Sequence, residues 1–279
     1  MFNFKFQIDK KTLEICCYVA GAGAFGVFIR WLQDQMAFNE AGLAEKSAFH
    51  LVVVGYILAM AFLFLRFVDR ERNRNSHLPE DFCGALKNAG KLYRILRWAA
   101  GGVICLGALL LFVSSETDGD VTLLRVLAGL GFVYGVTYPL VLAAANRPVR
   151  RQGLLCLGAV IPVAFFAFWL IVCYKRNDIN SVVWAFAIEM LAVCAAMAAF
   201  FRLAGFLFDS ANPWRSLFFS MFGTGACVMA IADDRYMGMQ LILLGTAGLL
   251  LLSTWIMFAN LQQGEIPPKV QPDDGFERL

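Results

Sequence analysis

One carboxylate lies inside a long apolar stretch of the sequence. Residues 182–201 read VVWAFAIEMLAVCAAMAAFF, and Glu189 is the only acidic or basic residue among them. A charged side chain at the centre of a membrane-spanning helix costs about 2.5–3.5 kcal/mol, so it normally faces protein or water instead of lipid. Such an acid can carry a proton, bind a cation or form an ion pair that holds helices in register.

The helical spacing of the neighbouring residues predicts which way Glu189 points. Alanines share its side of the predicted helix, at positions Ala185, Ala192, Ala196 and Ala199. Small residues allow helices to approach closely and mark the buried face of a bundle. We therefore expect Glu189 to point into the protein. If the helix begins near Ser181, the rise per residue places Glu189 roughly 12 Å below the outer surface.

Other polar side chains are expected in the same outer half of the membrane. They are Arg30, His50, Arg125, Tyr134 and Gln240. We predict that Arg125 or Arg30 is the counter-charge of Glu189, since an unpaired buried ion would become neutral. The arginines also fit a second interpretation, in which each extends toward the membrane surface. The set is compatible with an ion or solute pathway and equally with a structural ion pair or a protonated Glu189.

Helix-weakening residues mark two of the predicted spans. Pro139 and Pro162 each remove a backbone hydrogen bond and tend to bend a helix. Gly131 and Gly135 precede Pro139 and form a GxxxG pair. These four residues suit a hinge in a moving helix, and they suit static packing around a bend as well.

The elements that carry these residues are apolar blocks separated by short polar stretches. Of the 279 residues, 59% are hydrophobic and 16% are charged. Each block can cross a hydrocarbon core of roughly 30 Å as a helix, which satisfies its own backbone hydrogen bonds. The alternation typical of a membrane β-barrel is missing. The sequence predicts an all-α integral membrane protein with eight spans, at about 13–32, 48–68, 96–115, 121–145, 153–174, 182–207, 216–232 and 238–260.

Basic residues predict the orientation of these spans. When both termini are placed in the cytoplasm, most of the 24 lysines and arginines fall on the cytoplasmic side of the membrane. We expect the protein to lie in the plasma membrane. The first span is expected to be an uncleaved signal anchor. The net charge of +3 therefore reflects topology and gives no reason to expect nucleic-acid binding. We divide the chain into a cytoplasmic segment 1–12, one transmembrane domain 13–261 and a flexible cytoplasmic tail 262–279.

The inner loop between the second and third spans has an amphipathic pattern. Phe82, Leu86 and Tyr93 recur at helical spacing, while Lys87 and Lys91 lie on another side. This pattern predicts an interfacial helix at about 76–95. It is expected to rest on the bilayer and contact anionic inner-leaflet lipids. Alternatively, the stretch 78–96 docks a cytoplasmic protein partner.

The sequence also allows a 4+4 direct repeat. Trp98 precedes Gly107 by the same interval that separates Trp214 from Gly223. The later pairs Gly131 with Asn146 and Gly245 with Asn260 also share one spacing. Internal repeats are common in transporters. Chance similarity between helices rich in Leu, Ala and Phe explains the match equally well.

Metal and enzyme motifs are missing from the sequence. The eight cysteines fall in predicted spans or an inner loop, and the only histidines are His50 and His77. This distribution argues against disulfides, a zinc site or a bis-histidine haem, so no cofactor or metal is expected. Walker A, GxSxG and HExxH patterns do not occur.

These observations lead to a ranked set of functions. The first is a permease-like or channel-like protein that moves an ion or small solute, and it is not expected to be an enzyme. The second is a non-transporting subunit, sensor or scaffold that binds a cytoplasmic partner or a second copy of itself. The third is an intramembrane lipid-active enzyme.

Overall fold

The computed structural model describes residues 10–37, 48–74, 76–87, 90–115, 121–146, 152–177, 184, 186–233 and 235–263. Its long helices are α1 (Lys10–Met36), α2 (Ala48–Arg72), α4 (Lys91–Ser114), α5 (Val121–Ala144), α6 (Gln152–Arg176), α7 (Ala187–Ala204), α8 (Pro213–Met229) and α9 (Met237–Ala259). Short elements accompany them: β1 (Ser76–His77), α3 (Phe82–Leu86), the 3-10 turns η3 (Gly205–Leu207) and η4 (Ala230–Ala232), and β2 (Gln262–Gln263).

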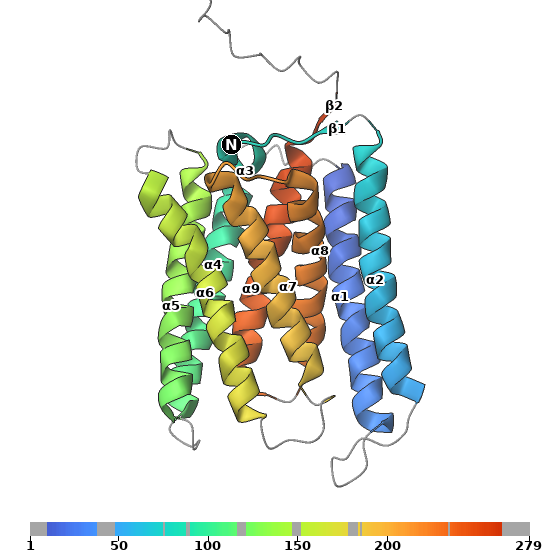
Figure 1. The fold of residues 1–279 in the computed structure, drawn as a ribbon, viewed down its shortest axis with the longest axis vertical. Coiled ribbons are helices and arrows are strands. Elements are labelled where there is room, and N and C mark those ends of the chain that lie inside the picture. The colour runs from blue at the N-terminus through green and yellow to red at the C-terminus, as the bar shows by residue number, and fades with distance from the viewer. Residues whose placement is uncertain are drawn as a thin grey trace, which may run out of the picture.

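Eight of the described helices are long and apolar enough to cross a membrane. Each overlaps one of the apolar blocks of the sequence, so the prediction of an all-helical protein with eight helices that could span a membrane is confirmed. The helices stand side by side in one bundle (Figure 1). Large apolar side chains on the rim of the bundle remain exposed, including Leu51, Phe62 and Leu154, as is expected for surfaces that face lipid.

The helices pack as a ring with an attached pair. Helices α4, α5, α6, α7, α8 and α9 each contact the next, and α9 closes the ring against α4. Helix α1 packs on α8 and α9, and α2 packs on α1 and α8. Helix α9 is therefore the most enclosed element, with contacts to α1, α4 and α8.

Glycines let the backbones of α4 and α9 touch. A Cβ atom on Gly107 would lie 2.7 Å from the carbonyl oxygen of Gly238, and one on Gly238 would lie 2.5 Å from the amide nitrogen of Leu111. No side chain fits at either distance. This close approach is the packing that small residues make possible between membrane helices.

One end of the bundle carries α3, β1 and β2, and we call it the α3 end (top of Figure 1). The strands pair antiparallel, with Ser76 opposite Gln263 and His77 opposite Gln262. This pairing places the loop after α2 and the segment after α9 on the same side, which agrees with an even number of spans.

The expected interfacial helix over 76–95 differs from the structure. The structure has only the five-residue α3 there, and α4 already begins at Lys91. The Asp81 side chain accepts a hydrogen bond from the Gly84 amide at 2.7 Å, which starts α3. Phe82 and Leu86 are buried in the core, and α3 packs on α9. Apolar residues that suited a lipid surface thus contact protein instead.

Several sequence-based expectations remain predictions. The 4+4 repeat, the cytoplasmic location of both termini and the domain limits are among them. Most of the N-terminal segment 1–12 and of the tail 262–279 lies outside the described residues.

Candidate functional site

Glu189 lies near one end of the bundle, in the first turn of α7. We predicted a deeper position for Glu189, because the prediction took the helix to begin near Ser181. In the structure α7 begins at Ala187. A carboxylate in the first turn is favoured by the positive end of the helix dipole. The predicted direction is confirmed: Glu189 is 3% exposed and shares a buried face with Ala192, Ala196 and Ala199.

Both carboxylate oxygens of Glu189 have hydrogen-bond donors. The Trp169 indole nitrogen on α6 donates to Oε1 at 2.6 Å. The Cys173 thiol, one turn further along α6, donates to Oε2 at 3.3 Å. The Arg235 guanidinium forms an ion pair with the same Oε2. Glu189 is therefore ion-paired and sealed from solvent, and its counter-charge is Arg235.

The charges continue beyond Arg235 in alternating order. Arg235 Nη2 donates to Asp233 Oδ2 at 2.7 Å, and Arg30 Nε on α1 donates to Asp233 Oδ1 at 2.6 Å. Asp233 and Arg30 are only 3% and 2% exposed. We call Glu189, Arg235, Asp233 and Arg30 the charge network, and the end of the bundle that carries it the network end. Burying ions is costly unless each is paired and hydrogen-bonded, as these are.

Neutral side chains extend the charge network to α2. Arg30 Nη1 donates to Gln33 Oε1 at 2.5 Å, and Gln33 Nε2 lies 2.7 Å from His50 Nδ1. The His50 ring stacks on Trp184, with ring centroids 4.8 Å apart. The Trp184 carbonyl oxygen also accepts from Arg30 Nη2 at 3.2 Å. Side chains from α1 and α2 thus reach the start of α7.

The connection between α8 and α9 is held in place by its own contacts. Gln240 Nε2 in α9 donates to the carbonyl oxygens of Ile231 and Asp233, at 3.3 and 2.9 Å. The Arg176 guanidinium lies over the Tyr236 ring, 5.0 Å from its centroid. Gln240 therefore positions the backbone that presents Asp233 and Arg235.

The electrostatics of this connection are set by burial. Burial raises the pKa of the Asp233 carboxyl to about 6, although the neighbouring Arg30 acts in the opposite direction. Burial also lowers the pKa of Arg235 to about 10. Arg235 remains a cation near neutral pH, while Asp233 titrates close to the physiological range.

Between Glu189 and the middle of the bundle, the interior of the ring is filled by aromatic side chains. This aromatic cluster consists of Tyr134 and Tyr138 on α5, Phe165, Phe166 and Trp169 on α6, and Phe200 on α7. The Tyr134 hydroxyl lies 3.3 Å from Thr246 Oγ1 and is fully buried. Trp169 belongs to the cluster and also donates to Glu189, so it joins the cluster to the charge network.

The structure brings together four of the predicted site residues and separates two. Glu189, Arg30, His50 and Gln240 all meet at the network end. Tyr134 lies in the aromatic cluster. Arg125 is exposed on α5, with its guanidinium 5.4 Å from the Phe112 ring centroid on α4. The prediction of Arg125 as a counter-charge is therefore wrong, and Arg30 reaches Glu189 only through Asp233 and Arg235.

The predicted hinge residues lie at helix contacts. A Cβ atom on Gly135 would lie 2.8 Å from Cys105 Sγ, and one on Gly101 would lie 2.6 Å from Pro139 Cγ. A Cβ atom on Gly131 would lie 3.2 Å from Phe165 Cε2. Pro162 is buried within α6, which continues past it, as α5 continues past Pro139. These contacts supply a packing reason for the residues, and a hinge role stays a prediction.

Sequence reasoning missed several members of the site. Asp233 and Arg235 stand in the stretch ADDR, which suggested only an acidic outer turn. The signal that was available is the mixture of acids and an arginine in a turn that was predicted to lie on the same outer side of the membrane as Glu189. Gln33, Trp169 and Cys173 carry no comparable signal, because their types are ordinary in membrane helices.

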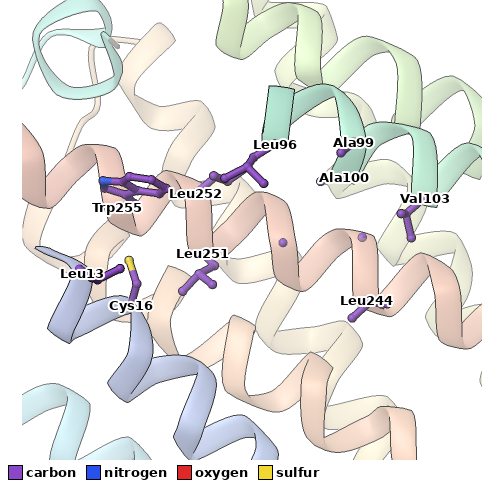
Figure 2. A pocket seen from close by; sticks show the side chains of 12 residues that line it. Leu13, Cys16, Leu96, Ala99, Ala100, Val103, Leu244, Leu251, Leu252 and Trp255 are labelled. Atoms are coloured by element: carbon purple, nitrogen blue, oxygen red, sulfur yellow. The ribbon is translucent and has the colours of Figure 1, made fainter. Parts of the chain in front are cut away.

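A lateral groove is the second feature that can hold a ligand. It lies between α1, α4 and α9 and has a volume of about 380 Å³ (Figure 2). Leu13 and Cys16 of α1, Leu96 of α4, and Leu251 and Trp255 of α9 line it. Nearly all of its surface is apolar, so it suits a hydrocarbon chain.

Metal ligands do not gather in the part of the chain that the structure describes, where no group of three or more His, Cys, Asp or Glu side chains could hold an ion. All eight cysteines are free thiols. Comparison of the chain with protein-family models, with curated proteins and with solved structures finds no match.

Proposed function

We propose that this polytopic membrane protein is permease-like or channel-like, and that the charge network closes one side of a path for an ion or small solute. The observation that carries the proposal is the alternating order of Glu189, Arg235, Asp233 and Arg30. Arg235 and Asp233 each touch two opposite charges. A charged solute can therefore replace one partner while the other contact is kept.

The position of the charge network supports this role. Arg235 and Asp233 lie on the connection between α8 and α9, outside the predicted spans, whereas Glu189 lies behind them against the aromatic cluster. Movement of this connection would expose Glu189 to the solution at the network end. The distribution of basic residues predicts that this end faces outward. In this proposal, the burial of Glu189 under Arg235 corresponds to a closed state of the path.

The test measures flux through the protein in liposomes. Purified protein is reconstituted with an entrapped pH dye, and proton movement is followed under an imposed potassium gradient with valinomycin. Parallel measurements replace protons by sodium or potassium. We expect flux above that of empty liposomes, and a changed rate for Glu189→Gln, because this variant removes the ion pair with Arg235.

The control is Lys175→Gln, which neutralises an exposed residue in the last turn of α6, near the network end, and should leave the rate unchanged. Equal flux in the native protein and Glu189→Gln would remove the Glu189 form of the proposal. No flux of any tested ion in either protein would have the same consequence for ion transport.

A lipid-active role is the second candidate, and the lateral groove favours it. The groove opens between α1 and α4, where an acyl chain can enter from the bilayer. Its lining offers only the Cys16 thiol and the Trp255 indole as polar side-chain groups. This chemistry suits binding of a hydrocarbon chain better than cleavage or transfer.

Docking of a cytoplasmic partner through 78–96 has weaker support. Phe82, Leu86 and Tyr93 are already buried within the protein. The Asn260 side chain after α9 donates to the carbonyl oxygens of Ala85 and Lys87, both at 3.0 Å, and so ties α3 to the bundle. A partner would have to bind the polar side of this segment.

A further inference from the structure

A second pocket lies at the α3 end, far from the charge network. It is formed between α1, α2 and α8 and has a volume of about 660 Å³. Arg66, Arg70 and Arg74 contribute its basic side chains, and Leu63, Phe67 and Met221 belong to its apolar wall. Unlike the lateral groove, it combines cationic and apolar surface.

The arginines of this pocket differ in whether they form an ion pair. Arg74 Nη1 pairs with Glu71 Oε1 at 3.0 Å, and Glu71 is buried. Arg66 lies over the Phe62 ring, 5.3 Å from its centroid, and is exposed. Among the described residues, neither Arg66 nor Arg70 forms an ion pair. The remaining acid of the pocket is Glu14 on α1, which is exposed.

The order of these side chains along α2 separates charge from hydrocarbon. Arg66 and Arg70 lie one helical turn apart on α2, about 6 Å along its axis, and Arg74 follows two residues after the end of α2. Leu63 and Phe67 lie on the same wall, and Leu63 comes earlier along α2, further from the bundle end. Tyr18 and Leu63 are also largely exposed at the rim, where acyl chains would surround them.

We propose that this pocket binds an anionic phospholipid, with its phosphate against Arg66 and Arg70 and an acyl chain along Leu63, Phe67 and Met221. The α3 end is the one that basic residues assign to the cytoplasm, and anionic lipids concentrate in that leaflet. A soluble anion would use the arginines alone and leave the apolar wall unexplained. The site is independent of the charge network and of any transport activity.

The test compares lipid selectivity in vesicles. The full-length protein is reconstituted in phosphatidylcholine vesicles that carry a small amount of spin-labelled phosphatidylglycerol or spin-labelled phosphatidylcholine. The motionally restricted fraction gives the relative affinity for each. We expect the native protein to prefer phosphatidylglycerol. Each arginine near a lipid surface contributes roughly a fivefold preference, so Arg66→Gln/Arg70→Gln should lower the selectivity about twenty-fivefold at most.

Two further variants make the test specific. Arg94→Gln removes an exposed arginine near the same end, at the start of α4, and should keep the preference. Glu14→Gln removes an exposed acid that lines the same pocket and should raise the affinity up to about fivefold. A gain of this kind cannot come from misfolding, so it holds even if the double variant is unstable.

Three results would overturn the proposal. The first is an unchanged preference in Arg66→Gln/Arg70→Gln. The second is an equal loss in Arg94→Gln, which would indicate diffuse attraction to the whole basic surface. The third is abolition of the preference by inorganic phosphate at constant ionic strength, which would identify the site as one for a soluble anion.

Discussion

The ion pair between Glu189 and Arg235 makes a quantitative prediction, because the two residues can be neutralised separately and together. Arg235→Gln leaves two buried carboxylates, Glu189 and Asp233, without their shared cation. Removing one partner of a buried pair typically costs about 3–5 kcal/mol. We therefore expect a loss in this range in the free energy of unfolding.

Glu189→Gln should cost less, because Arg235 keeps its contact with Asp233 at 2.7 Å and Trp169 can still donate to the amide oxygen. We expect about 1–3 kcal/mol. In the double variant neither buried charge of the pair remains. Its cost should fall short of the sum of the two single costs by about 1–3 kcal/mol.

The assay is reversible unfolding by dodecyl sulfate in mixed dodecyl maltoside micelles, followed by circular dichroism. Lys175→Gln serves as the control for loss of an exposed charge near the network end and should stay within about 0.5 kcal/mol of the native protein. If the costs of the single variants add within about 0.5 kcal/mol, the two side chains are not coupled. That result would refute the charge network as described.

Three further predictions concern titration, packing and a hydrogen bond, all measured by the same unfolding assay. Since the pKa of Asp233 is raised from 3.8 to about 6 in the folded state, its contribution to stability is present below about pH 4 and falls by about 3 kcal/mol as the pH rises through 6. Asp233→Asn should lose this slope, and an unchanged slope would contradict the assignment. Gly238→Ala should cost at least about 1–3 kcal/mol, because its Cβ meets the α4 backbone. Gly102→Ala, with open space around its Cβ, should be neutral or slightly stabilising. Tyr134→Phe should cost about 0.5–1.5 kcal/mol, since Thr246 loses its partner, and no change would show that the hydroxyls are not bonded.

Hydrophobic length and helical spacing predict this fold well at the level of single helices. The eight apolar blocks became the eight long helices, because lipid leaves an apolar segment no other way to satisfy its backbone. The buried side of α7 was also predictable. Small residues crowd onto it, and Ala192, Ala196 and Ala199 are fully buried.

The partner of Glu189 was not predictable from the same signals. Periodicity shows which side of a helix meets protein, but not which helix or connection it meets. Arg235 stands outside any span, so no helical wheel includes it. The start of α7 was missed for a related reason, since Trp184 and Phe186 are as apolar as the helix that follows them. The short α3 was mistaken for a surface helix because apolar side chains suit both lipid and the flank of α9.

The bond between Arg30 and Asp233 has a consequence for how the protein is made. The two residues are 203 positions apart, so Arg30 enters the membrane long before its partner is synthesised. At about 5–20 residues per second, the ribosome needs roughly 10–40 s to reach Asp233. During that interval the first hairpin holds an arginine without its final carboxylate. Until the chain beyond α8 has been inserted, the charge is held by partners on its own helix, the Gln33 side chain at 2.5 Å and the Asp34 carboxylate at 3.8 Å, together with water at the interface.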